Sequence, residues 1–181
     1  MDLIVSNLSL HHEVESERTF EHWAQALRPE GVVLFSALGP DTLKELQELY
    51  QSLNWGPPAH PLIDMHDLGD MLVHSGFSDP VVDMERLVLT YSDANTFLQD
   101  LRVLGRNMSP NRFGALRGRM FLRDLLSALE RRKDETSGGR FSMTFEVIYG
   151  HAFKARVKEP KTGEVRLDLE NVRAQLKKPK I

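Results

Sequence analysis

The sequence contains no cysteine, which excludes disulfide bonds, zinc–thiolate centres and cysteine nucleophiles. It also lacks long apolar runs, because stretches such as Val32–Phe35 are far too short to cross a bilayer. The segment Met1–Leu3 has no positive charge of the kind that opens a signal peptide. These absences predict a cytoplasmic protein that does not contact a membrane. The 181 residues, 41% of them hydrophobic, suffice for one sizeable core.

Several catalytic motifs are missing as well. No G-x-S-x-G elbow presents a serine nucleophile, and no H-E-x-x-H pair presents histidines to zinc. Asp64, His66 and Asp67 are close in sequence, but they are typical of the polar first turn of an amphipathic helix. We therefore expect no metal site and no catalytic nucleophile. A G-x-G turn, which lets a backbone approach a nucleotide cofactor, is also absent.

Charge is distributed unevenly along the chain. Residues 1–100 hold 4 lysines and arginines against 17 aspartates and glutamates, whereas residues 102–133 hold 9 against 2. The basic segment predicts either a surface that attracts an anionic partner or solvated helix faces that pair with the acidic half. Nucleic acid is a poor candidate partner, because the net charge is -3 and no nucleic-acid-reading motif is present.

The first third of the chain alternates strand and helix signals. Residues 2–6 and 32–38 are apolar runs of strand length, and the second is nearly continuous, as in a strand buried on both faces. Between them an amphipathic helix is predicted to end at Pro29. Thr42 and Glu45 have capping-box spacing and predict the start of another helix. Strand, helix, strand, helix is the α/β pattern.

A Gly/Pro-rich loop at 54–61 separates this part from a third helix, for which Gly76 is the predicted C-terminal cap. A strand is expected over 81–91, and Ser92 or Asp93 should cap the helix that follows it.

Residues 107–118 have the composition of a loop, and a further helix follows them. The clearest strand covers 141–153, and strict alternation predicts one apolar face made of Phe141, Met143, Phe145, Val147, Tyr149, His151 and Phe153. Residues 157–181 are charged and weakly patterned. We therefore expect one domain over 1–156 and a flexible tail over 157–181.

Five strings of sequence resemble successive segments of one family. They are DLIVSNLSLHH, LRPEGVVLFSALGPDTLKEL, IDMHDLGDMLVHSGFSDPVVDMERLVLTY, DLRVLGRN and TFEVIYGHAF, and they cover roughly residues 2–155. In this order they are similar to the fourth strand and onward of class I S-adenosylmethionine-dependent methyltransferases, which have a Rossmann-like fold. The later strings resemble most specifically the malonyl-acyl-carrier-protein O-methyltransferases of biotin synthesis.

The resemblance implies the C-terminal half of that family's α/β sheet, with strands in the order 4-5-7-6, the last strand antiparallel, and helices flanking the sheet. The family's cofactor-binding first half, with its glycine-rich turn, has no counterpart here, so we expect a truncated domain. Asn7 and Leu8, just after the first strand, would border the methionine end of S-adenosylmethionine. An ordinary strand-to-loop turn is the alternative for both residues.

The resemblance also implies a substrate that carries a free carboxyl group, for which arginine, histidine and tyrosine are suitable donors. The candidates are His11, His12, Arg102 and Tyr149. Each has a simpler alternative: solvent-facing histidines, an arginine favoured near a helix C-terminus, and a core tyrosine with one hydrogen bond. For docking an acidic acyl-carrier protein, the candidates are Arg112, Arg117, Arg119 and Arg123.

The function implied is methyl transfer from S-adenosylmethionine to the free carboxyl of malonyl-acyl-carrier protein, with the isolated chain expected to be inactive. One alternative is a related methyltransferase-like assembly factor of respiratory complex I, and another is a non-catalytic fragment that binds a partner. In the complete fold another strand lies beside residues 3–5, so an open edge at Leu3–Val5 predicts self-association.

Overall fold

The computed structural model describes residues 1–13, 15–105, 113, 115 and 117–156. The predicted tail at 157–181 and most of the loop predicted at 107–118 lie outside the described residues. Among those described, no helix has the length and apolar character needed to cross a membrane. In chain order the elements are β1 (Leu3–Ser6), the 3-10 helix η1 (Leu10–His12), α1 (Ser16–Ala26), β2 (Val32–Leu38), α2 (Lys44–Ser52), α3 (Met65–His74), β3 (Phe77–Tyr91), α4 (Ala94–Val103), α5 (Arg119–Glu130), the 3-10 helix η2 (Glu135–Ser137) and β4 (Phe141–Lys154).

The strands form one open sheet in the order β1-β2-β4-β3. β1 and β2 are parallel, and β4 runs antiparallel to β2 on one side and to β3 on the other. When the strands are numbered as in the family, this is the order 4-5-7-6 with an antiparallel last strand. The predicted α/β fold class is therefore confirmed, and strand 141–153 lies beside strand 32–38 as expected.

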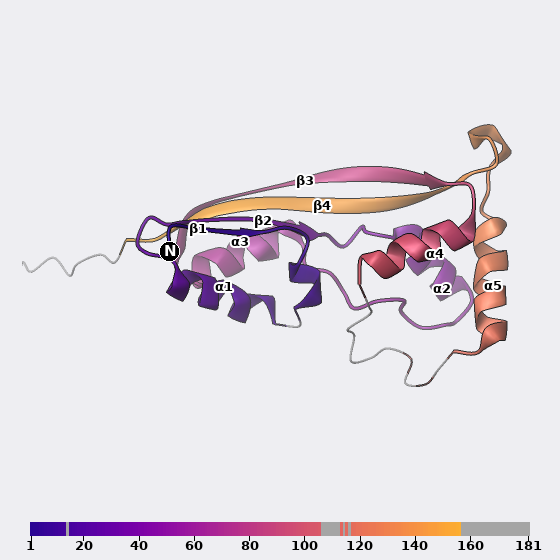
Figure 1. Ribbon diagram of the computed structural model, residues 1–181, viewed down its shortest axis with the longest axis horizontal. Helices are drawn as coiled ribbons and strands as arrows, with labels where there is room; N and C mark the ends of the chain where they lie inside the picture. Colours follow the sequence, from indigo (N-terminus) through magenta and orange to yellow (C-terminus); the bar gives the residue numbers. More distant parts are fainter. Residues whose placement is uncertain (14, 106–112, 114, 116, 157–181) are drawn as a thin grey trace, which may run out of the picture.

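Two separate cores are built on residues of opposite parity in β4. Phe141, Met143 and Phe145 join α2, α4 and α5 in one core, whereas Ile148 and Ala152 join α1 and α3 in the other. Figure 1 shows the two helix groups at opposite ends of the long β3–β4 ribbon, whose right-handed twist lets both groups pack against it.

The predicted single apolar face of 141–153 is therefore wrong in its second half. Tyr149 and Phe153 are 45% and 41% exposed, because α1 and α3 cover the opposite, even-numbered face there.

β3 begins four residues earlier than predicted, at Phe77 rather than Val81. A register shift between Ser78 and Val81 interrupts its pairing with β4, and Asp79 within it has a φ of 52°. Such a bulge inserts one extra residue, so the side chains on its two sides exchange faces of the sheet. Phe77 therefore points into the same core as Val82, although one position is odd-numbered and the other even-numbered. A strand that contains Pro80 is still possible, because β3 lies at the edge of the sheet.

Most predicted helix ends are confirmed. Asp93 caps α4, where its carboxylate accepts a hydrogen bond from the Thr96 backbone at 2.8 Å. This bond is the largest cause that lowers the pKa of Asp93 to about 2. Asp64 caps α3 in the same way, and Gly76 follows that helix with a φ of 89°.

The capping box predicted for α2 is wrong. The helix begins at Lys44, after Leu43 in a left-handed conformation, and no side chain caps it. Glu45 instead accepts hydrogen bonds from the backbone and hydroxyl of Thr144 in β4. Thr42 donates its hydroxyl to the Glu146 carbonyl and accepts from the Glu146 backbone N–H. Both side chains attach α2 to the sheet rather than closing the helix end.

One face of the sheet is not covered by the described residues. The strand register places Val5, Leu34, His151 and Val81 in one row across all four strands. Three of these side chains are large, apolar and exposed, with Val5 at 65%. In Figure 1 the helices at this end lie only beneath the sheet. We call this surface the uncovered face.

Candidate functional site

A pocket of about 420 Å³ lies below the sheet, between η1 and the helix group of α2, α4 and α5. Its walls come from η1, the end of β2, α2, the loop before α3, α4, α5 and Phe145 of β4. Most lining side chains are apolar, namely Leu38, Leu43, Leu46, Pro58, Ala59, Leu62, Leu98, Leu101, Leu104, Leu122, Leu125 and Phe145. A concave, mainly apolar pocket with a few polar groups is the usual form of a small-molecule site.

The polar groups of this pocket include most of the residues predicted to bind substrate. His11 and His12 line it from η1, and Arg102 lines it from the last turn of α4. The chain separates these positions by about ninety residues, so the fold, not the sequence, brings them together. Tyr149, the fourth candidate, does not line this pocket.

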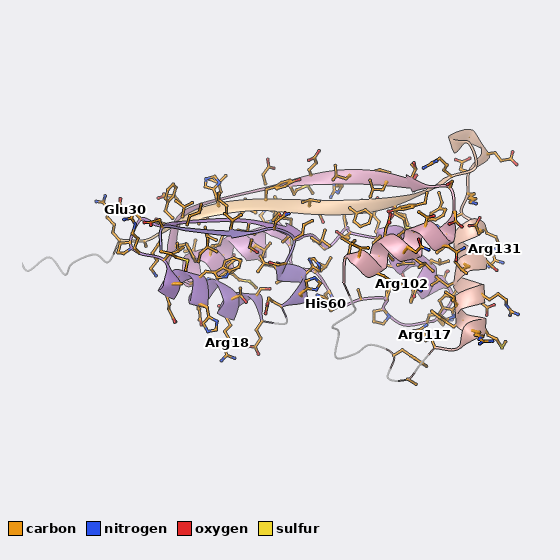
Figure 2. All side chains as sticks on the ribbon, viewed as in Figure 1. Arg18, Glu30, His60, Arg102, Arg117 and Arg131 are labelled. Atoms are coloured by element: carbon orange, nitrogen blue, oxygen red, sulfur yellow. The ribbon has the colours of Figure 1, made fainter. Side chains whose placement is uncertain are left out.

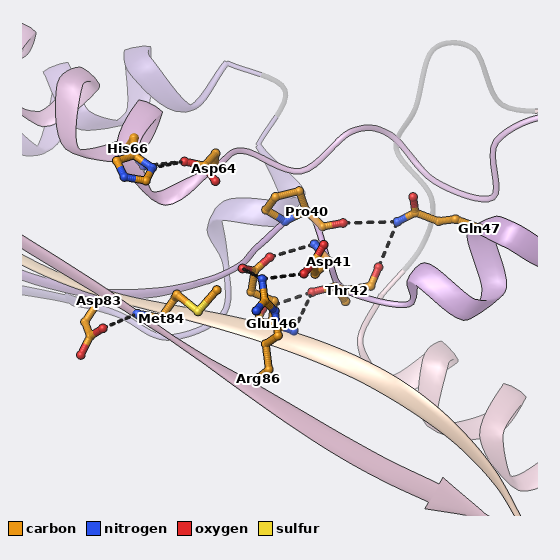
Figure 3. A network of polar contacts seen from close by, with 10 residues as sticks. All are labelled: Pro40, Asp41, Thr42, Gln47, Asp64, His66, Asp83, Met84, Arg86 and Glu146. Atoms are coloured by element: carbon orange, nitrogen blue, oxygen red, sulfur yellow. Dashed lines mark hydrogen bonds and ion pairs between the residues drawn. The ribbon is translucent and has the colours of Figure 1, made fainter.

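A buried carboxylate holds the wall of the pocket at the end of β2. The Glu146 side chain accepts a hydrogen bond from the Asp41 backbone at 2.8 Å and lies 3.9 Å from Arg86, which also pairs with Asp41 (Figure 3). Gln47 donates to the Thr42 carbonyl at 3.1 Å. These contacts fix the turn that leads from β2 into the pocket-lining start of α2.

His11 is half-buried and linked to α4. Its Nε2 lies 3.3 Å from the Leu104 carbonyl, whereas its Nδ1 is buried without a hydrogen-bond partner among the described residues. Burial lowers the pKa of His11 below its usual 6.5, and the charges of His12 and His60 act in the same direction. His11 is therefore neutral at physiological pH, with its proton on the nitrogen that faces Leu104.

Gly105 allows the end of α4 to approach η1 closely. Its φ is 123°, and a Cβ atom there would lie 2.3 Å from the His12 ring. Only glycine adopts this backbone conformation readily, so Gly105 brings Arg102 and the two histidines to one pocket.

Sequence reasoning missed one lining residue, His60. It lies in the loop before α3, and Figure 2 marks it together with Arg102. The Nδ1 of His60 is also buried without a hydrogen-bond partner among the described residues. The loop has no periodicity from which this contact could have been predicted, and only the presence of a histidine among prolines marks the position.

Asn7 and Leu8, the predicted cofactor contacts, lie at the carboxyl end of β1. The Ser36 hydroxyl donates to the Asn7 side-chain oxygen at 2.6 Å, and the Leu8 backbone donates to the same hydroxyl at 3.0 Å. Asn7 and Tyr149 line a second, more open hollow on the uncovered face. The structure therefore places Tyr149 near Asn7 and apart from His11, His12 and Arg102.

The arginines predicted to dock a carrier protein differ in their surroundings. The Arg117 guanidinium donates to the Trp55 carbonyl at 2.8 Å and lies over the rings of Phe121, Phe113 and Tyr50. Its cation–π contacts join α2 to α5. Arg119 is exposed, and Arg123 is exposed and pairs with the neighbouring Asp124. Arg112 lies outside the described residues.

In the described part of the chain, no three histidine, aspartate or glutamate side chains are grouped so that they could hold a metal ion.

Comparison with known proteins identifies relatives of this chain. No family model matches it. It is 40% identical over 155 residues to the malonyl-[acyl-carrier protein] O-methyltransferase of Gallionella capsiferriformans, covering 85% of this chain and 52% of that protein. The protein of that name in Coxiella burnetii, numbered 1, is 42% identical over 84% of this chain and 53% of its own length. The Methylovorus protein is 41% identical over 88% and 54%.

These matches confirm the predicted resemblance to malonyl-acyl-carrier-protein O-methyltransferases. The chain spans about half the length of the curated relatives that it matches.

Two solved structures share the fold. A Bacillus halodurans protein described as a candidate methyltransferase superposes with a TM-score of 0.53 at 12% identity, covering 86% of this chain and 65% of that one. The YcgJ protein of Bacillus subtilis gives 0.51 at 14% identity, with 86% and 64% covered. At these identities the similarity establishes the Rossmann-like fold alone.

Proposed function

We propose that this chain provides the acceptor-binding part of an S-adenosylmethionine-dependent methyltransferase that esterifies the free carboxyl of malonyl-acyl-carrier protein, a step toward biotin. The observation that carries the proposal is about 40% identity, over most of the chain, to curated proteins named for that reaction. The pocket supports it, because an apolar site with Arg102 and histidines suits an acyl group that ends in a carboxylate. The relatives favour neither of the two alternatives, the assembly factor and the non-catalytic fragment. A cytoplasmic location remains part of the proposal.

The reaction needs little acid–base chemistry from the protein. A carboxylate oxygen attacks the methyl carbon, the carbon–sulfur bond breaks, and its electron pair stays on sulfur, giving an ester and S-adenosylhomocysteine. The carboxylate is already anionic, so no general base is required. The protein has to orient the carboxylate and exclude water. In this chain, Arg102 and the histidines would orient the acceptor, and the leucines of the pocket would exclude water.

The residues present fit one end of the cofactor. The Asn7 side-chain oxygen is held by Ser36, which leaves the exposed amide nitrogen at the carboxyl edge of the sheet, where ligands of open α/β folds bind. Asn7 and Leu8 would therefore contact the methionine end. S-adenosylmethionine supplies the electrophilic methyl group when it is bound.

Carrier docking is proposed for the exposed arginines at the start of α5, Arg119 and Arg123. Charges at the edge of an interface act mainly on the association rate and are screened by salt. Arg117 serves the packing of α2 against α5, so its replacement would disturb the fold as well as any docking.

A chimera tests the proposed reaction. This chain would replace the matched 155-residue segment of the Gallionella capsiferriformans relative, and methyl transfer from labelled S-adenosylmethionine would be measured with malonyl-acyl-carrier protein. We expect transfer by the chimera to malonyl-acyl-carrier protein, none to the butyryl form, and none by the 181-residue chain alone, because the cofactor contacts proposed for it are limited to one end.

The parent relative is the positive control for this assay. A chimera that is folded and binds S-adenosylhomocysteine, yet transfers no methyl group to the malonyl form, would overturn the proposed function. Equal transfer to the butyryl form would be chemically incompatible with carboxyl esterification and would point to a different acceptor.

A further inference from the structure

The uncovered face of the sheet has two neighbouring rows of apolar side chains. Beside the central row, which contains Leu34 and Val81, the strand register aligns Leu3, Val32 and Phe153. Leu3 and Phe153 are 51% and 41% exposed, and the helices at this end lie only beneath the sheet (Figure 1). Apolar surface that extends over several strands is unfavourable in water, so a partner that covers it stabilises the chain.

The face becomes polar toward the carboxyl end of β1. The next row in the register contains Ser36, Tyr149 and Asp83, and Asn7 lines the same hollow as these three residues. A partner therefore needs an apolar side for the first two rows and polar groups only near this end. An amphipathic helix that packs on a sheet has such an apolar side.

The free edge of β1 adjoins this face. β1 is the first strand in the sheet order, so one edge of its backbone has no strand beside it among the described residues. It pairs in parallel with β2, and further parallel strands reach a sheet through crossovers that place helices on its faces. One strand-and-helix unit beside β1 would therefore cover the edge and the face together.

The relatives contain enough chain for such a unit. The segment that matches this chain is only about half of each curated relative, and the two solved structures with this fold also extend beyond the part that superposes. A strand–helix–strand unit needs only about 30 residues, which is far fewer than the unmatched half of a relative contains.

A second copy of this chain would fit the surface less completely. Its helices already direct their apolar sides into the two cores, so it can offer only its own uncovered face. Two such faces packed together leave the edge of β1 unpaired in both copies. The unmatched half of a relative is the occupant that satisfies both parts of the surface.

We propose that the uncovered face and the free edge of β1 form an interface that binds the unmatched half of such a relative as a separate polypeptide. Both cores beneath the sheet are built from residues of this chain, so the chain folds without the partner and association needs no covalent link. The bound half covers Leu34 and Val81 with an amphipathic helix and adds a strand beside β1. The inference rests on the length of the relatives and not on the methyl-transfer reaction.

Coexpression from separate genes tests the interface. The chain is produced together with the part of the Gallionella capsiferriformans relative that it does not match. The complex is purified through a tag on that part and examined by sedimentation velocity. We expect a one-to-one complex that persists at about 10 μM, as for interfaces of standard size. The matched segment of the same relative is the control partner and should bind at least about tenfold more weakly.

Substitutions on the face show where the partner binds. Leu34→Glu combined with Val81→Lys places charges in the central row. This double variant should weaken association with the unmatched part by at least about tenfold, because each charge would be buried without a partner. Val103→Lys adds a charge at the end of α4, away from this face, and should change nothing. Circular dichroism checks that both variants are folded, and hydrogen exchange should show new protection of β1 in the complex.

The chimera, in which peptide bonds join the same two parts, is the folding control for the unmatched part. The proposal would be overturned by an unfolded chimera, by the absence of a complex from the separate genes, or by equal affinity of the double variant and the unsubstituted chain. Equal binding of the matched segment would also overturn it, since the face would then be an interface between like copies. A complex that forms but transfers no methyl group would refute the proposed reaction and leave the interface intact.

Discussion

At the scale of single residues, Gly150 and Phe35 pack closely against each other in the sheet. They face each other across β4 and β2, and a Cβ atom at Gly150 would lie 2.2 Å from the Phe35 ring. Phe35 is 4% exposed and packs in the core that α1 and α3 cover. The glycine is needed here for close approach rather than for an unusual backbone conformation.

Gly150→Ala should therefore lower the free energy of unfolding by about 1–3 kcal/mol, the usual effect of overpacking a core. Urea denaturation monitored by circular dichroism measures it. Gly69→Ala is the matched control, because a Cβ there meets nothing closer than 3.9 Å, and alanine favours the interior of α3 by about 0.5–1 kcal/mol. Equal stability of the two variants would show that Phe35 moves aside.

The substrate-binding roles predicted from the sequence stay predictions, but the structure shows which candidates lie together, and Tyr149 lies apart from the other three. His11, His12 and Arg102 were chosen as carboxylate donors, and the structure places all three in one pocket. His60 was missed, because a loop position has no periodic pattern that reveals its neighbours. For Arg117, composition could not distinguish a solvated charge from one stacked on Phe121.

At the scale of elements, the Glu146 carboxylate is one of several attachments between β4 and the turn that follows β2. The side chain is nearly fully buried, and it accepts a hydrogen bond from the Asp41 backbone beside Arg86. Glu146→Ala leaves that part-buried N–H without its acceptor, which should cost about 1–3 kcal/mol of stability. Glu146→Gln keeps an acceptor and should lose less.

Denaturant titration of both variants at neutral pH checks this order, with the exposed neighbour Glu85→Ala as the control. If Glu85→Ala destabilised the chain as much as Glu146→Ala, the carboxylate would have no special role in holding the turn.

Helices and strands were predicted well where the apolar pattern of the local sequence determined their bounds. They were predicted poorly where a contact with a distant part of the chain determined them. Strand 32–38 was predicted with its observed bounds, because a nearly continuous apolar run of that length is typical of a strand buried on both faces. The spacing of Thr42 and Glu45 fits a capping box, yet β4 offers both side chains stronger partners in Glu146 and Thr144. A sequence pattern contains no information about that competition.

At the scale of the whole molecule, the uncovered face exposes large apolar side chains from several strands. Leu34 and Val81 lie in its central row, and Leu3 and Val5 lie at the β1 edge of the sheet. Contiguous exposed apolar surface marks an interaction site in a folded protein. The predicted edge at Leu3–Val5 is thus one border of a broader apolar surface.

The isolated chain should consequently self-associate, and Leu34→Glu combined with Val81→Lys should reduce this without unfolding it. Sedimentation velocity over a concentration series measures the change. Val103→Lys, at an 87% exposed valine outside this face, is the control and should have no effect. A monodisperse monomer of the unsubstituted chain would contradict the prediction.

The division into two cores has a further consequence for how the molecule opens. β3 and β4 supply side chains to both cores, with Phe77 in one and Tyr91 in the other. Such an arrangement favours sub-global opening, in which one cooperative unit melts while its neighbour keeps its protection from hydrogen exchange. Ligand in the pocket would stabilise the unit formed by α2, α4 and α5, and the shared ribbon would be the route by which that stabilisation reaches α1 and α3.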